Sequence, residues 1–362
     1  KMCYRTYWKQ WSFSIFIFIF SLFVFSCSSN NSIDYHKTNK IPVVDTYYDS
    51  EVIDNYRWLE DDLSQETGEW VKSQNTTTFD YLNKIPFREE LKERLKKLWD
   101  YEKISAPFKE GNYTYYFKNS GLQNQRVLYR SSESSDLEVF LDPNTFSNDG
   151  TTSLAGLSFS KDGTMLAYSI SEGGSDWRKI ITINTETKKL VEDTIVDVKF
   201  SGVSWKYNDG FYYSSYDKPK GSELSEKTDQ HKLYFHKLGT SQEKDKLIFG
   251  GTPEEKNRYV RGFVTNDNRF LIIDAAKRTS GNKLFIKDLK NSSEIKTIVN
   301  DYDSNTSLID NLGSKLFLFT DHNSPNNRVV TVDFGDLNKS NWKDFIAESD
   351  FVLSLSKAGG FF

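Results

Sequence analysis

Residues 157–170, LSFSKDGTMLAYSI, place two short apolar runs on either side of a Lys-Asp-Gly turn. Aromatic and β-branched residues around a turn of this composition predict an antiparallel hairpin. Residues 179–184 supply a third apolar run before Glu186. The region therefore predicts consecutive strands of one small antiparallel sheet.

The same order of strand, turn, strand, loop and strand returns in groups that begin near residues 203, 262 and 308. Blades of a β-propeller recur in this way, at about 40 to 50 residues. The residues that take equivalent places in the four groups are Phe159, Trp205, Phe263 and Ile309. The alternative, a β-sandwich, would not need this order to repeat. The predicted fold class is mainly β, a propeller, and residues 105–143 read as an earlier blade, which makes four to five blades.

The last group runs directly into residues 351–362, so the sequence ends among its strands. An unclosed propeller leaves sheet edges without hydrogen-bond partners, and such edges promote aggregation. We therefore expect more sequence to follow in the complete protein.

A different texture precedes the strands. Residues 52–99 are rich in Leu, Glu, Lys and Trp, and their apolar positions recur at helical spacing. Ser64 and Thr67 are suitable caps for a helix over residues 64–82, and a second helix is predicted over residues 87–98. Its stripe of Leu91, Leu95 and Leu98 requires an apolar partner surface, which the sequence does not identify.

Composition excludes several classes of function. The 47 basic and 51 acidic residues nearly balance, without a long basic run in the body of the chain, so nucleic acid is not an expected partner. The two cysteines, Cys3 and Cys27, both lie in the first thirty residues. The histidines do not have the spacing of metal ligands: His36, His231, His236 and His322. We expect no disulfide in the body, no metal and no cofactor.

The N-terminus has the layout of an export signal. Basic residues precede the apolar stretch 13–25, which is too short for a spanning helix, and Cys27 follows Ser26. This pattern resembles a bacterial lipoprotein signal over residues 1–27 with Cys27 as the lipidated residue, although Phe25 is bulkier than usual. The alternative is an uncleaved anchor with an incidental cysteine. Polar residues 28–40 predict a flexible tether. The expected location is periplasmic or cell-envelope, with the membrane as a partner.

Motifs spread along the chain carry a family resemblance. In order they are DNYRWLED (54–61), GLQNQRVLY (121–129), LDPN (141–144), FSKDG (159–163), GSDW (174–177), HKLY (231–234) and HNSPN (322–326). From about residue 41 to 362 the sequence resembles the prolyl oligopeptidase family, with Asn55 in place of the usual proline. The resemblance implies a seven-bladed propeller over an α/β-hydrolase domain. Residues 41–99 would belong with the hydrolase domain, which would cover the leucine stripe, and residues 100–362 with the propeller.

The resemblance also implies an activity for the complete protein. In this family the propeller admits only short peptides, and the hydrolase domain cuts them after proline with a serine, aspartate and histidine triad. No GxSxG elbow occurs in this sequence, so all three triad residues would lie beyond residue 362 and no catalytic residue is assigned here. Ser175, in a turn that lacks the second glycine, is interpreted as structural. By itself this chain is expected to be inactive.

One substrate-binding residue is implied by the family pattern. The segment VKFS (198–201) with Trp205 matches the propeller segment that supplies a phenylalanine to the family's peptide pocket, which makes Phe200 the candidate. An aromatic face offers apolar contact to a proline-containing peptide, whereas the alternative is that Phe200 packs within its blade. Further pocket contacts would fall near residues 276–279 and are not assigned.

A rival from another class is a propeller that only binds and carries no enzyme. The segment 52–99 argues against it, because a binding propeller would not need residues that resemble part of a hydrolase domain. Oligopeptidase B and the dipeptidyl peptidases share the architecture, but their motifs fit this sequence less well.

Overall fold

The computed structural model describes residues 33–133, 135–219, 221–223, 228–252, 256–291 and 294–356. The chain divides into two compact units, one up to Lys92 and one from Glu93. Cys27 and the predicted export signal lie outside the described residues. Among those that are described, no helix is both long and apolar enough to span a membrane.

The first unit opens with a β-hairpin, which the sequence analysis did not predict in this otherwise helical segment. Strand β1 (Val43–Tyr47) pairs antiparallel with β2 (Ser50–Asp54), and their valine and isoleucine content favours strand. The DNYR motif follows. Asp54 accepts hydrogen bonds from the Tyr56 amide (2.8 Å) and from Nε of Arg57 (2.9 Å), and Arg57 also binds Asp45. The motif thus closes the hairpin onto the short 3-10 helix η1 (Arg57–Glu60).

The predicted helices are present. Helix α2 (Gln65–Asn83) has Ser64 as its N-cap, with the Ser64 hydroxyl accepting a hydrogen bond from the Thr67 amide. Helix α3 (Arg88–Trp99) carries acidic residues in its first turn and lysines in its last. The leucine stripe on α3 is about half exposed: Leu91 (49%), Leu95 (56%) and Leu98 (53%).

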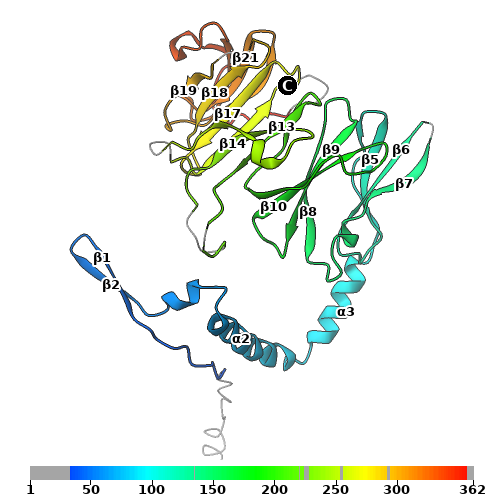
Figure 1. Ribbon diagram of the computed structural model, residues 1–362, viewed down its shortest axis with the longest axis vertical. Helices are drawn as coiled ribbons and strands as arrows, with labels where there is room; N and C mark the ends of the chain where they lie inside the picture. Colours follow the sequence, from blue (N-terminus) through cyan, green and yellow to red (C-terminus); the bar gives the residue numbers. More distant parts are fainter. Residues whose placement is uncertain are drawn as a thin grey trace, which may run out of the picture. The chain divides into compact units, whose positions relative to one another are not determined.

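Among the described residues of the second unit, five antiparallel sheets follow one another in chain order (Figure 1). The first contains β3 (Lys103–Ile104), β4 (Phe108–Glu110), β5 (Tyr113–Asn119), β6 (Val127–Ser132) and β7 (Ser135–Leu141). The second contains β8 (Thr152–Phe159), β9 (Met165–Glu172), β10 (Trp177–Asn184) and β11 (Ile195–Lys199). The third contains β12 (Ser204–Lys206), β13 (Gly210–Ser215), β14 (Lys232–Lys237) and β15 (Lys246–Phe249). The fourth contains β16 (Tyr259–Val264), β17 (Phe270–Ala276), β18 (Lys283–Asp288) and β19 (Lys296–Val299). The fifth contains β20 (Thr306–Leu312), β21 (Lys315–Thr320), β22 (Arg328–Asp333) and β23 (Lys343–Ile346).

The core lies between successive sheets. Side chains alternate along a strand, so Phe270 and Ile272 pack toward the fifth sheet while Leu271 and Ile273 pack toward the third. Separate buried clusters join each sheet to the next in this way through all five. A sheet that is covered on both faces needs continuous apolar runs in its inner strands, which is why the FLII run of β17 shows no polar alternation. The four to five blades predicted from the repeat correspond to these five sheets.

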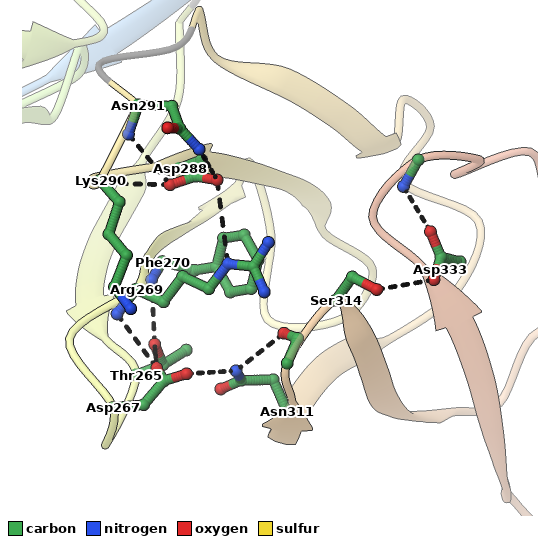
Figure 2. Close-up of polar contacts among 12 residues, drawn as sticks. Thr265, Asp267, Arg269, Phe270, Asp288, Lys290, Asn291, Asn311, Ser314 and Asp333 are labelled. Carbon is green, nitrogen blue, oxygen red and sulfur yellow. Dashed lines mark hydrogen bonds and ion pairs between the residues drawn. The ribbon is translucent and has the colours of Figure 1, made fainter.

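Hydrogen bonds within the hairpin turns explain why an Asp-Gly-type motif recurs in the sequence. Figure 2 shows those of the fourth blade. Oδ1 of Asp267 accepts hydrogen bonds from the Thr265 hydroxyl (2.7 Å) and the Arg269 amide (3.0 Å), and the Thr265 hydroxyl accepts one from the Phe270 amide (3.0 Å). Ser160 and Asp162 make the same set of bonds in the second blade. In both of these turns a short polar side chain therefore stabilises the turn from within.

This shared geometry corrects one detail of the predicted repeat. Thr265 corresponds to Ser160 in the turn, so Val264, not Phe263, is the counterpart of Phe159. In the fifth blade a register shift between Leu308 and Asp310 leaves Ile309 outside the pairing with β21. The sequence repeat was thus assigned one residue too early in the fourth blade, because apolar residues stand at both adjacent positions.

Candidate functional site

Several loops at one end of the blades surround a cavity of about 700 Å³. Because strands in each sheet are antiparallel, the β9–β10 and β17–β18 loops and the connections from β11 to β12 and from β19 to β20 all emerge at this end. The lining residues are Arg178, Phe200, Ser201, Gly202, Tyr259, Arg261, Asp274, Ala276, Arg278, Thr279, Gly281, Asn282 and Asn305. The cavity thus draws on segments more than one hundred residues apart.

Phe200 stands at this cavity, directly after β11. Its ring makes edge contacts with Tyr216 (6.3 Å between centroids) and Tyr259 (5.8 Å), yet the residue remains 36% exposed. Its φ of 52° lies in the left-handed region, which a bulky side chain rarely adopts. Local strain of this kind persists where the surrounding structure holds a side chain in one position. Phe200 therefore packs on tyrosines and also lines the cavity. Its role in binding a peptide stays a prediction.

The support beneath Phe200 is a buried histidine. Tyr216 stacks on His231 with 4.4 Å between ring centroids, and Nε2 of His231 donates a hydrogen bond to the Lys199 carbonyl (2.9 Å). The Val260 amide donates to Nδ1 of the same ring (2.8 Å). Burial lowers the pKa of His231 to about 4, although the hydrogen bond to Lys199 acts in the opposite direction. The neutral ring thus ties β11 of the second blade to β16 of the fourth.

The polar wall of the cavity is equally constrained. Nδ2 of Asn282 donates to Oδ2 of Asp274 (2.6 Å), while its Oδ1 accepts from the Thr306 amide (2.8 Å). Burial raises the pKa of Asp274, against the nearby charge of Arg261, which lowers it. Gly281 has a φ of 77°, and a Cβ there would collide with the Tyr302 carbonyl, so only glycine fits.

The three arginines at this cavity were not predicted from the sequence. Arg178 lies on β10, Arg261 on β16, and Arg278 in the loop after β17. Nothing in their spacing distinguishes them from other basic residues, because only the propeller brings them together. The segment 276–279, left unassigned above, contributes Ala276, Arg278 and Thr279 to the same cavity.

Ser175 lies in the β9–β10 loop. Its hydroxyl accepts a hydrogen bond from the Trp177 amide (3.1 Å), and its carbonyl accepts one from Ser171 (2.7 Å). These bonds stabilise the turn, in agreement with the structural interpretation. Within the described part of the chain no cluster of His, Cys, Asp or Glu has the arrangement of a metal site.

Comparison with known proteins decides the family. The model of the prolyl oligopeptidase N-terminal beta-propeller domain matches residues 36–362. The chain belongs to the prolyl oligopeptidase family. Its five sheets are therefore blades of that family's propeller, and the resemblance inferred from the motifs is confirmed.

Individual members of the prolyl oligopeptidase family are also similar. A prolyl endopeptidase of Elizabethkingia miricola is 52% identical over 98% of this chain and 50% of its own length. That of Elizabethkingia meningoseptica is 51% identical over 96% of this chain and 50% of its own length. Among solved structures, a prolyl endopeptidase studied for inter-domain dynamics has a TM-score of 0.82 at 26% identity, over 90% of this chain and 49% of the other. The chain spans about half the length of these relatives.

Proposed function

We propose that the complete protein is a prolyl endopeptidase of the serine type and that this chain forms its N-terminal propeller part. The observation that carries the proposal is the 52% identity, over nearly the whole chain, to a prolyl endopeptidase. Nothing in the comparisons supports the rival reading as a propeller that only binds. A hydrolase domain would supply the serine, aspartate and histidine triad and would cover the apolar stripe of α3.

The propeller's part in this function is to limit access to short peptides and to hold them. Phe200 supplies an apolar face at the cavity, and its position is maintained by Tyr216 and Tyr259. A proline ring or a neighbouring apolar side chain of the peptide would pack against this face.

Assays of the complete gene product test the proposed activity. We expect cleavage of a fluorogenic peptide with proline before the scissile bond, much slower cleavage when alanine replaces that proline, and loss of activity with a serine-directed inhibitor. Residues 28–362 alone should not cleave either peptide. A complete product that cleaves neither peptide would contradict the proposal.

A second experiment addresses Phe200. Replacement by alanine removes its apolar face, and we expect KM for the proline peptide to rise about tenfold with little change in kcat. Tyr207→Ala is a matched control, because Tyr207 is also exposed and also has a positive φ of 49°, but lies in the β12–β13 turn at the other end of its blade. An equal rise in KM for the two variants would contradict the assignment of Phe200 to the peptide site.

We also propose that the protein is exported and anchored through a lipid on Cys27, with residues 28–40 as a tether. The support is the order of basic residues, apolar stretch and cysteine at the N-terminus. In a Cys27→Ala variant the exported protein should move from the membrane fraction to the soluble fraction. Retention of this variant in membranes would show that the apolar stretch itself is the anchor.

A further inference from the structure

The cavity beside Phe200 carries an excess of positive charge. Its lining contains three arginines, Arg178, Arg261 and Arg278, and one acidic residue, Asp274. None of the three arginines forms an ion pair or a side-chain hydrogen bond with any residue that the structure describes. Asp274 neutralises part of this charge only, and its carboxylate is already engaged by Asn282.

Arg178 gives a second and independent indication. Its Nε is buried and has no hydrogen-bond partner among the described residues. A buried donor without a partner is unfavourable, and native structures retain few of them unless a ligand or water completes the bond. The backbone of Arg178 is held in β10 opposite Val198 of β11, two residues before Phe200. The Arg178 side chain, with its unpaired Nε, and the aromatic face of Phe200 therefore belong to one wall.

The arginines come from different blades. Arg178 lies in the second blade and Arg261 in the fourth, where it stands directly opposite Asp274 in the β16–β17 pairing. The strands near these two arginines are held in place, because His231 bonds to the backbone of β11 and of β16. Guanidinium groups present a planar fork of donors that matches a carboxylate in two parallel hydrogen bonds. A peptide that enters this cavity therefore meets an apolar face and guanidinium groups together.

We propose that this cavity selects peptides that carry an acidic side chain close to their proline, with Arg178 and Arg261 as specificity-determining residues. The proposal rests on the proposed function as a peptidase. Phe200 contacts the apolar part of the peptide, and the guanidinium groups bind its carboxylate.

The test compares two peptides on the complete protein. They are identical except for glutamate or glutamine at one of the three residues before proline, and each position is examined in turn. Isothermal titration calorimetry gives Kd for versions of both peptides whose scissile bond cannot be hydrolysed, and kcat/KM is measured separately with the cleavable peptides. We expect the glutamate peptide to bind about fivefold to tenfold more tightly at one position, and this preference to decrease at high salt.

Arg178→Gln and Arg261→Gln should each bring the ratio of the two Kd values close to one, because the guanidinium group that distinguishes glutamate from glutamine is removed. Arg261 is exposed, so its variant tests the proposal even if Arg178→Gln fails to fold. Arg126→Gln is the control, because Arg126 is exposed, lies in the first blade and does not line the cavity.

The outcomes separate the two proposals. Cleavage of both peptides with equal Kd values at every position would overturn the acidic preference and leave the peptidase assignment intact. Tighter binding of the glutamate peptide without any cleavage would support the carboxylate site and contradict the peptidase function. A preference that persists in both arginine variants would overturn the assignment of these residues.

Discussion

Nδ2 of Asn311 donates a hydrogen bond of 2.8 Å to Oδ2 of Asp267, which joins strand β20 of the fifth blade to the first hairpin turn of the fourth (Figure 2). Asn208 makes the corresponding bond to Asp162 between the third and second blades (2.5 Å). The aspartate that stabilises its own turn from within thus also holds the next blade.

Loss of this bond between blades should be measurable. Asn311→Ala removes one hydrogen bond to a charged group, so we expect the free energy of unfolding to fall by about 1 to 2 kcal/mol. Asn208→Ala should have a similar effect, because its partner has the same position in the repeat. Denaturant unfolding at pH 7 measures both. If neither variant differs from the parent chain, these bonds do not contribute to the stability of the propeller.

Because of His236, the free energy of unfolding should decrease as the pH rises above neutrality. Burial would lower its pKa, but hydrogen bonds and charge attraction from Asp245 and Glu192 outweigh this effect and raise the pKa to about 9. The folded state therefore keeps a proton that the unfolded state releases above about pH 6.5. Between pH 6.5 and 9 the free energy of unfolding should fall by up to about 1.4 kcal/mol per unit. His236→Gln should flatten this slope in denaturant titrations; an unchanged slope would contradict the assignment.

The contribution of His231 to stability should instead decrease as the pH falls. Its pKa of about 4 means that the folded state stays neutral while the unfolded state takes up a proton below about pH 6.5. At pH 7, His231→Phe should cost about 2 to 4 kcal/mol, because the Lys199 carbonyl and the Val260 amide lose their partner. The difference between parent and variant should narrow as pH falls from 6.5 to 4. Thermal melts across this range measure it, and a constant difference would show that the ring is already protonated in the fold.

Gly163 and Gly174 provide a matched pair of substitutions. Both have positive φ, at 72° and 76°. A Cβ on Gly163 would collide with Gly111 and lie 2.9 Å from the Glu110 carbonyl carbon, whereas a Cβ on Gly174 has no atom of the described residues within 4 Å. Gly174→Ala should cost about 1 kcal/mol from backbone strain alone. Gly163→Ala should cost about 2 to 4 kcal/mol, because the first and second blades must also separate. Similar melting temperatures for the two variants would show that the two blades can move apart at this contact at little cost in stability.

The order of elements could be predicted from the sequence because it depends on local chemistry. Turn residues such as Asp162 and Gly163 mark hairpins, and Ser64 marks the start of α2 at the residue predicted. Repetition of these signals implied blades, since one small sheet with two apolar faces must pack against another. The hairpin over β1 and β2 was missed because the helical composition that follows it dominates that part of the chain.

The site was only partly predictable. Phe200 was predicted as a peptide contact from its segment, and this stays a prediction. The sequence alone could not separate packing from exposure, because both depend on where Tyr216 and Tyr259 lie. Arg178 and Arg261 lie 83 positions apart in the sequence and face one cavity because β10 and β16 come from alternate blades. The tertiary contacts also make His231 neutral and His236 positively charged at neutral pH, although they stand five residues apart. One histidine lies between backbone groups and the other between carboxylates, and only the tertiary structure decides which partners each one meets.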